Sequence, residues 1–283
     1  MVDFLYMELT AKKIKELNYS EYVGLVRETN RPSGGIKTVQ KVCVNAFIDE
    51  KTKVLEIGCN TGFTSMNIAQ LTGASVIGVD LVKESLKAAN KKIKKYGVKN
   101  VRFEEASATS LPYEDESFDV VWLSNVLSFI DEKELALKEC IRVLKKGGFL
   151  AFVPIYYQTI PPQDIVDEVS EAINSKLDIF KKNDWINFVK KIPVKMEMVF
   201  NEDFEYLNVS GDIDNYLAEV FDKESVNNIE SEELKLLKEK GKYFMELFNK
   251  NLKHAAFTVF ILQKRNYIEE RELFLSKPGA ESK

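Results

Sequence analysis

Cysteine and histidine are scarce in this sequence, and their scarcity excludes several kinds of site. The three cysteines, Cys43, Cys59 and Cys140, are scattered without C-x-x-C spacing, and His254 is the only histidine. This pattern indicates neither a disulfide framework nor a zinc site, so we expect no bound metal.

Long apolar runs and an excess of one charge are also lacking. No apolar stretch approaches the ~18–20 residues that span a bilayer, and the N-terminus has no signal-peptide pattern, so we expect a cytoplasmic protein without membrane contact. Lys and Arg number 40 against 44 Asp and Glu, a net charge of −4. Nucleic acid is therefore an unfavoured partner, because affinity for it depends mainly on neutralising phosphates.

Strands and helices alternate through the first half of the chain. We expect helices near 62–72, 83–97 and 131–145 between short β-type runs. This alternation indicates an α/β fold, doubly wound, with a mostly parallel sheet covered by helices on both faces. The expected strands lie near 53–57, 75–80, 100–105, 118–124 and 148–154.

The rest of the chain divides into an arm, an insertion region and a tail. We expect a helical arm, which could serve as a lid, in residues 1–35, a main domain in 36–265 with its cofactor half at 50–155, helical insertions within 155–253, and a peripheral tail at 266–283. Asn30 to Gly35 contains the Pro and Gly of a hinge. The secondary structure expected outside the cofactor half is helical at 10–28, 35–48, 162–190, 212–222 and 230–252, and β-type at 194–207 and 256–262.

The most informative stretch is Val54 to Gly62, an apolar strand that runs into a carboxylate and a glycine turn. We expect Gly58 and Gly62 to let the backbone approach a ligand, because a Cβ at either position would occupy that space. Glu56 would repel a phosphate, which makes a ligand with an ammonium group the better match.

A second carboxylate follows the next buried strand. Asp80 lies 22 residues after Gly58, close to the spacing at which an acidic residue binds ribose hydroxyls in doubly wound folds. Glu56 and Asp80 could each merely cap a helix. The pair at this spacing favours a site for a nucleoside that carries a positive charge.

Five blocks of sequence resemble the class I S-adenosylmethionine-dependent methyltransferases (methyltransferase domain 11/25-like). Residues 56–62 are similar to the first motif of that family, 76–80 to the second and 101–113 to the third. Residues 117–122 resemble the fourth strand, and 142–148 the turn into the fifth. The resemblance implies a Rossmann-like, seven-stranded sheet whose last strand is antiparallel.

The resemblance also implies a cofactor site for S-adenosylmethionine and its product S-adenosylhomocysteine. Glu56, with backbone carbonyls near Gly58 and Asn125, would hold the ammonium, and Tyr22, Arg27 or Arg31 the carboxylate. Ser107 stands where many members have Asp, and a hydroxyl can accept the same hydrogen bond from adenine. The cofactor residues so implied are Glu56, Gly58, Asn60, Gly62, Asp80, Leu81, Ser107, Ala108, Asn125, Tyr22 and Arg31.

The acceptor is harder to read, because a sulfonium methyl group is already activated and no catalytic residue need exist. Ser124-Asn125-Val126-Leu127 lacks the Asn-Pro-Pro-Tyr type of sequence found in methyltransferases that act on exocyclic amines of nucleic acids. A small molecule is therefore the preferred acceptor, modified at an O, N or C atom. Candidates for its pocket are Tyr19, Ser128, Phe129, Tyr156, Tyr157, Trp185 and His254.

Two alternatives from other classes stay open. One is a methyltransferase that acts on protein or RNA, for which we expect an open, charged rim. The other is an adenosylmethionine-binding protein that does not methylate, or an aminopropyltransferase. The sequence indicates neither the acceptor nor the oligomeric state.

Overall fold

The strands of the first half form the centre of the molecule. The computed structural model describes residues 9–207, 212–222 and 231–265, so the expected peripheral tail at 266–283 lies outside the described residues. The strand order is β3-β2-β1-β4-β5-β8, with β7 on the outer side of β8. The strands are β1 (Lys53–Ile57), β2 (Ser75–Asp80), β3 (Val101–Glu105), β4 (Phe118–Ser124), β5 (Leu144–Val153), β6 (Ile155–Tyr157), β7 (Met196–Glu205) and β8 (Ala255–Lys264).

The sheet is mostly parallel, as expected, with an antiparallel strand near its edge. Strands β1 to β5 pair in parallel, and β8 pairs antiparallel with both β5 and β7. Strand β6 continues β5 beyond Pro154 in unchanged register, because Phe152 lies opposite Phe260 and Ile155 lies opposite Phe257. The eight strands therefore occupy seven positions in the Rossmann-like sheet.

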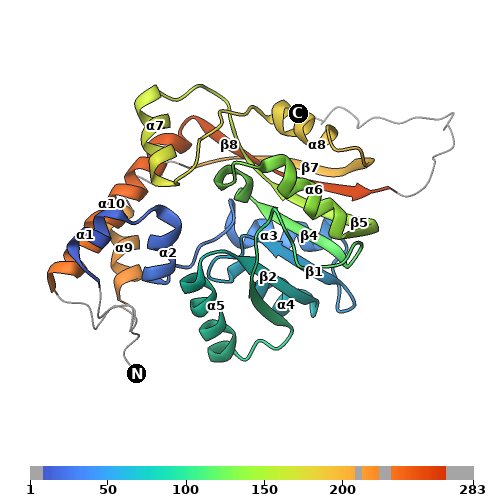
Figure 1. Cartoon of the computed structure of the whole chain (residues 1–283), viewed down its shortest axis with the longest axis horizontal. Coiled ribbons are helices and arrows are strands. Elements are labelled where there is room, and N and C mark those ends of the chain that lie inside the picture. Colours follow the sequence, from blue (N-terminus) through green and yellow to red (C-terminus); the bar gives the residue numbers. More distant parts are fainter. Residues whose placement is uncertain (1–8, 208–211, 223–230, 266–283) are drawn as a thin grey trace, which may run out of the picture.

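Helices cover both faces of the sheet (Figure 1). Alternate residues of β1 point to opposite faces, so that Val54 contacts one apolar cluster and Leu55 the other. Apolar residues of α3, α4 and α5 pack on the Val54 face, and those of α6 and α8 on the Leu55 face. These helices are α3 (Gly35–Asn45), α4 (Phe63–Thr72), α5 (Lys83–Tyr96), α6 (Lys133–Val143) and α8 (Lys182–Lys190).

A separate layer of helices lies beside the sheet, at the side where the arm and the long C-terminal helix meet (Figure 1). It has its own apolar core, in which Tyr22, Val23 and Val26 of the arm are fully buried with Phe244 and Leu237. The arm therefore belongs to a packed layer and is not a loose appendage. The helices of this layer are α1 (Ala11–Glu16), α2 (Tyr19–Val26), α7 (Gln163–Ala172), α9 (Ile213–Phe221) and α10 (Ser231–Leu252).

Three boundaries differ from the sequence prediction. The arm contains two helices because Asn18 starts α2 with a capping box, in which it accepts a hydrogen bond from the Glu21 amide. The helical stretch after Pro162 is interrupted between α7 and α8. The fifth strand begins at Leu144, directly after α6, and a bulge in its pairing with β4 between Phe118 and Val120 accommodates the additional residues.

The abrupt change from α6 to β5 leaves helix carbonyl groups without helical partners. The Lys264 ammonium provides the missing donor: its Nζ donates to the carbonyl oxygens of Ile141 and Leu144 at 2.8 and 2.6 Å. No helix in the described part of the chain has the length and apolarity needed to cross a membrane.

Candidate functional site

The glycine turn after β1 is held against the end of β2. The amides of Gly58 and Cys59 both donate to the Val79 carbonyl, at 2.8 and 3.0 Å. Gly58 has φ +72°, and a Cβ on it would lie 2.6 Å from Cγ2 of Val126. The absence of a side chain at Gly58 thus permits the left-handed turn and the approach of Val126.

Asp80 connects the end of β2 to this turn. Its Oδ2 accepts from the Asn60 amide at 2.8 Å, and its Oδ1 accepts from the Val82 amide at 2.9 Å. Burial raises the pKa of the carboxyl group, and these amide hydrogen bonds partly offset the rise. The carboxylate is thereby fixed at the wall of a cavity of about 460 Å³, which we call the Asp80 cavity.

Glu56 lies deeper, with 4% of its surface exposed. Its Oε2 accepts from the amide and the hydroxyl of Ser65, at 2.8 and 2.5 Å. Burial raises the pKa of Glu56 to about 7, despite the opposing hydrogen bonds from Ser65 and Thr64. The side chain lines a second cavity of about 440 Å³, which we call the Asn125 cavity.

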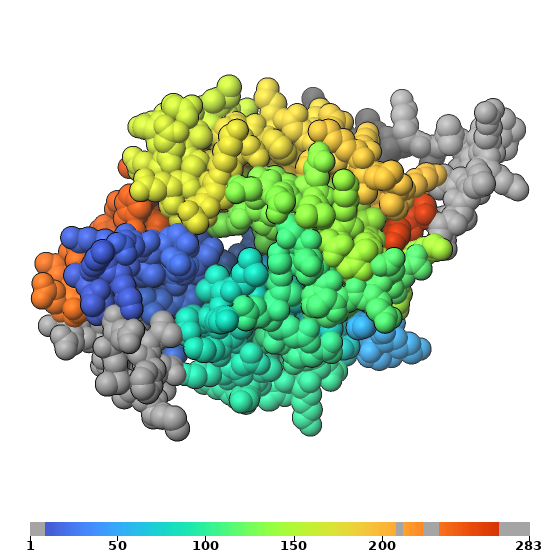
Figure 2. Space-filling model, in the orientation of Figure 1, coloured from blue at the N-terminus to red at the C-terminus, as the bar shows by residue number. Residues whose placement is uncertain are grey.

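The two cavities meet at the carboxyl ends of the central strands. Gly58, Asn60 and Ser124 line both, as do Tyr19 of the arm and Phe129. In the space-filling view a hollow opens where the blue arm approaches the cyan and green residues of the sheet half (Figure 2). A long ligand could therefore extend from one cavity into the other.

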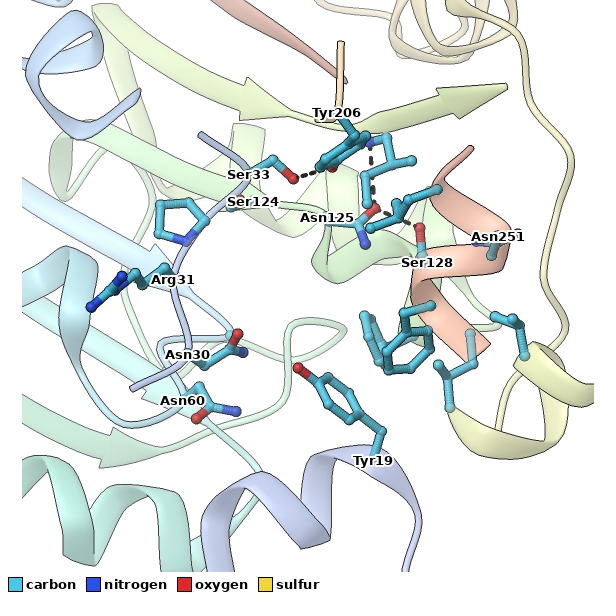
Figure 3. Close-up of a pocket in the computed structure, with 18 of the residues that line it drawn as sticks. Tyr19, Asn30, Arg31, Ser33, Asn60, Ser124, Asn125, Ser128, Tyr206 and Asn251 are labelled. Atoms are coloured by element: carbon cyan, nitrogen blue, oxygen red, sulfur yellow. Dashed lines mark hydrogen bonds between the residues drawn. The ribbon is translucent and has the colours of Figure 1, made fainter. Parts of the chain in front are cut away.

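Paired polar side chains surround the Asn125 cavity (Figure 3). Asn125 has φ +50°, and its Oδ1 accepts from the Ser128 hydroxyl at 2.9 Å. The hydroxyls of Ser33 and Tyr206 lie 2.5 Å apart. These pairs bring the hinge after the arm, the end of β4 and the end of β7 to one chamber.

Most of the predicted site residues line one of the two cavities. Leu81, Ser107 and Ala108 join Asp80 in the Asp80 cavity, and the Arg31 guanidinium lies over the Phe63 ring, 5.6 Å from its centroid, at the edge of the Asn125 cavity. The predicted residues that line at least one cavity are Tyr19, Arg31, Glu56, Gly58, Asn60, Asp80, Leu81, Ser107, Ala108, Asn125, Ser128, Phe129 and Tyr157.

Two of the predicted cofactor residues lie elsewhere. Tyr22 is fully buried in the helical layer, where its hydroxyl oxygen faces Gly241 of α10, so it is not placed to bind a carboxylate. Gly62, with φ +83°, lines neither cavity; a Cβ there would lie 2.5 Å from the Phe103 ring. Packing accounts for both residues. Arg27, the left-handed C-cap of α2, also lines neither cavity.

Three predicted pocket residues also lie outside the Asn125 cavity. Trp185 is buried in the core on the Leu55 face of the sheet, and its Nε1 donates to the Ile155 carbonyl at 2.8 Å. Tyr156 packs into the same core, since neighbouring strand residues point to opposite faces and only Tyr157 reaches the cavity. His254 instead has its Nδ1 2.9 Å from the Thr159 hydroxyl.

Several lining residues were missed by the sequence prediction. Asn30 and Ser33 belong to the segment whose Pro and Gly residues indicate a hinge. Phe248 and Asn251 lie on α10, whose sequence carries no motif, although its cavity-lining residues Met245, Phe248 and Leu252 recur at helical spacing. This spacing indicates that one side of α10 is buried, but it does not indicate that this side lines a cavity. Tyr206 follows β7 and likewise carries no motif.

The joined cavities at the ends of β1, β2 and β4 are typical of α/β proteins that bind nucleoside-containing ligands at the topological switch point. Among known families, one described as "Methyltransferase domain" matches residues 55–152. An uncharacterized protein from Haemophilus influenzae is 28% identical over 193 residues, covering 67% of this chain and 77% of that protein. This chain spans less than half the length of the curated, named methyltransferases that it matches.

Solved structures share the fold. The MccD protein superposes with a TM-score of 0.67 at 25% identity, covering 83% of this chain and all of that one. A phosphoethanolamine N-methyltransferase of Haemonchus contortus, solved with S-adenosylhomocysteine, gives a TM-score of 0.63 at 18% identity and covers 94% of this chain and 60% of its own.

Residues 55–152 thus match a methyltransferase domain in a fold shared with solved methyltransferases, and S-adenosylmethionine is the cofactor that this domain implies. The residues present fit this molecule. The Asp80 carboxylate is held by two amides and faces a cavity, and Glu56 lies in the adjoining one, where an ammonium would favour its charged form.

Proposed function

We propose that this chain transfers a methyl group from S-adenosylmethionine to an O, N or C atom of a small molecule. The observation that carries this proposal is the Asn125 cavity, which adjoins the cofactor residues and is lined by the arm hinge, α7 and α10. A cavity of about 440 Å³ is within the usual range for small-molecule sites.

The cofactor residues divide between the two cavities. In the proposed arrangement Asp80 binds the ribose hydroxyls, Leu81 packs on the adenine, and the Ala108 amide and Ser107 hydroxyl contact the ring. Glu56 and backbone carbonyls near Gly58 and Asn125 hold the ammonium, and Arg31 holds the carboxylate. All of these residues line one or both of the two cavities, which supports this arrangement.

When bound, the cofactor supplies an activated sulfonium methyl group. The contribution of the chain is to hold the acceptor in line with that group and to exclude water, and positioning of this kind is worth up to ~7–11 kcal/mol. Tyr19 and Phe129 line both cavities and so lie where the two ligands would meet.

The names of relatives support a small acceptor without identifying it. Those that match include demethylmenaquinone, arsenite and 27-O-demethylrifamycin SV methyltransferases, whose acceptors differ widely. A protein or RNA acceptor would need an open, charged rim, and the helical lining of the Asn125 cavity favours a small molecule instead.

Labelled cofactor tests the proposal. The purified chain is incubated with S-adenosylmethionine labelled in its methyl group and with a metabolite extract, and the labelled product is identified. We expect S-adenosylhomocysteine and a labelled small molecule. Methylthioadenosine would indicate aminopropyl transfer, label in protein or RNA would indicate a macromolecular acceptor, and absence of cofactor binding at millimolar concentration by calorimetry would contradict the whole assignment.

A further inference from the structure

The Asn125 cavity has an apolar wall made by two helices. Val169 of α7 and its C-cap residue Ile173 lie one turn apart, and Met245, Phe248 and Leu252 follow one face of α10. Asn251, also on α10, lies on the side of the chamber opposite Arg31 and Asn60 (Figure 3). The part of the cavity farthest from the glycine turn is therefore mainly apolar.

Charged groups in this cavity are few and have partners. Among the described residues that line it, only Arg31, Glu56 and Asp178 carry a charge. The first two are assigned to the cofactor, and the Asp178 carboxylate lies 3.1 Å from the Lys133 ammonium. A charged acceptor at the apolar wall would lose hydration without meeting a free counter-charge.

One buried polar pair remains at this wall. The Tyr157 hydroxyl lies 2.9 Å from Nδ2 and 3.1 Å from Oδ1 of Asn251, and both residues are 5% exposed. Burial raises the pKa of Tyr157, so its hydroxyl is neutral at ordinary pH. A primary amide has two hydrogens and two acceptor lone pairs. After its contact with Tyr157, Asn251 can offer a donor and an acceptor to a ligand.

We propose, on the basis of the function proposed above, that the acceptor is an uncharged molecule with an apolar body and a hydroxyl or carbonyl group. The apolar body packs on α7 and α10, and the Tyr157–Asn251 pair binds the polar group. The pair positions the acceptor and sets its specificity; it takes no part in the transfer itself. Carboxylate and phosphate acceptors are disfavoured by the same contacts.

Three probes of similar shape test this inference: 2-naphthol, naphthalene and 2-naphthoate, each added to protein saturated with S-adenosylhomocysteine and followed by ligand-observed NMR. We expect 2-naphthol to bind about fivefold to tenfold more tightly than naphthalene, because it adds a hydrogen bond in a buried site. We expect 2-naphthoate to bind more weakly than either. Equal or tighter binding of 2-naphthoate, or no binding of 2-naphthol at millimolar concentration, would overturn the proposal.

Variants connect the preference to the named pair. Tyr157→Phe combined with Asn251→Leu removes both polar groups while nearly preserving shape, a change that is often close to neutral for stability. The affinity ratio of 2-naphthol to naphthalene should fall to near one, with naphthalene still bound. A ratio that stays at the wild-type value would refute the role of the pair.

The matched control is Thr159→Val, which removes the contact with His254 outside the cavity and should leave the ratio unchanged. Calorimetry with S-adenosylhomocysteine is done on every variant. Failure of the wild-type chain to bind S-adenosylhomocysteine would contradict the proposed function, whereas retained binding without the expected probe preference contradicts only the inference about the acceptor.

Discussion

Glu56 and Asp80 show how two carboxylates in one site acquire different properties. Burial raises the pKa of both. Asp80 accepts two backbone amides and lines the Asp80 cavity, whereas Glu56 is bonded to Ser65 at the N-terminal part of α4. Asp80 is suited to hydroxyl donors and Glu56 to a cation, so the role of each residue can be tested separately.

Replacement of Asp80 should weaken cofactor binding. Asp80→Ala removes the acceptors for the ribose hydroxyls and should cost ~1.5–3 kcal/mol of binding free energy for S-adenosylhomocysteine, measured by calorimetry. Because Asp80 also holds the Asn60 and Val82 amides, thermal unfolding of each variant serves as the stability control. Asp80→Asn keeps one carbonyl acceptor and should lose less. Unchanged affinity in Asp80→Ala would show that ribose binds elsewhere.

Glu56 should make cofactor affinity depend on pH. With a pKa of about 7 it is mainly protonated at about pH 6 and mainly charged at about pH 8. A bound ammonium favours the carboxylate, so the affinity for S-adenosylhomocysteine should rise over this interval. In the Glu56→Gln variant, the affinity for S-adenosylhomocysteine should be low and should not change with pH. A slope that persists in Glu56→Gln would assign the titration to neighbouring Asp80 or Cys59.

The raised pKa of Glu56 has the opposite effect on the stability of the ligand-free chain, which should fall as the pH rises. Between pH 4.5 and about 7 the folded chain binds the Glu56 proton more strongly than the unfolded chain does. The contribution of Glu56 to unfolding free energy is therefore fully present at acid pH and is lost as the pH rises through this window. Ligand-free unfolding curves across this range check the sign, with Glu56→Gln as reference.

Side-chain direction explains which single residues could be predicted from the sequence. Glu56, Asp80 and Asn125 line the cavities because each lies at or near the carboxyl end of a parallel strand, a position that the pattern indicates. Tyr22 and Trp185 face helices and strands far away in sequence, and no local signal fixes that choice. For Tyr156 and Tyr157, the two-residue period predicts opposite faces without identifying which face is the site.

At the level of elements, the glycine turn and the short helix after β4 are coupled. Gly58→Ala should destabilise the fold by ~1–3 kcal/mol because of its positive φ alone, with an added cost from the contact with Val126. A double-mutant cycle with Val126→Ala, followed by chemical unfolding, separates the two costs. If Val126→Ala gives no relief, the proposed collision is wrong.

The junction between α6 and β5 depends on Lys264, a residue far away in sequence that lies on the neighbouring strand β8. Lys264→Met should leave the carbonyls of Ile141 and Leu144 without their donor and lower the unfolding free energy by ~1–3 kcal/mol. The affinity for S-adenosylhomocysteine should not change, since Lys264 lies outside both cavities. Lys253→Met, at an exposed lysine, is the control for loss of charge.

The arrangement of elements was largely predictable, and the exceptions have physical causes. Hydrophobic alternation places the strands of the cofactor half within a few residues, because strand and helix periods differ strongly there. The immediate passage from α6 into β5 escaped prediction, since it depends on Lys264. The position of the arm was not predicted either. Its apolar residues could pack on the sheet or on other helices, and the partners that they meet on α9 and α10 are far away in sequence.

For the whole molecule, the open question is whether the arm responds to ligand. The Thr61 hydroxyl donates to the Glu28 carbonyl at 2.6 Å, which connects the glycine turn to the end of the arm. We expect hydrogen exchange of Tyr19 to Gly35 to slow when S-adenosylhomocysteine is added, and this effect to shrink in Thr61→Val. An arm equally protected with and without ligand would rule out a ligand-ordered lid.

Deletion of residues 1–30 is a less selective test than these point variants. The deletion should abolish methyl transfer while weakening the binding of adenosine much less. It also removes Tyr22, Val23 and Val26 from the core of the helical layer. Thermal unfolding of the truncated chain should therefore begin at a lower temperature than that of the intact chain.

The division between sheet and helical layer has a consequence for evolution and engineering. Residues of the β1 to β4 half supply nearly all cofactor contacts proposed here, whereas α7 and α10 supply the apolar wall of the acceptor chamber. The recognised family match covers only the sheet half. If the proposed function holds, substitutions on the cavity faces of the two helices would change the acceptor while the cofactor contacts are preserved, and exchange of those faces between homologues is a route to altered specificity.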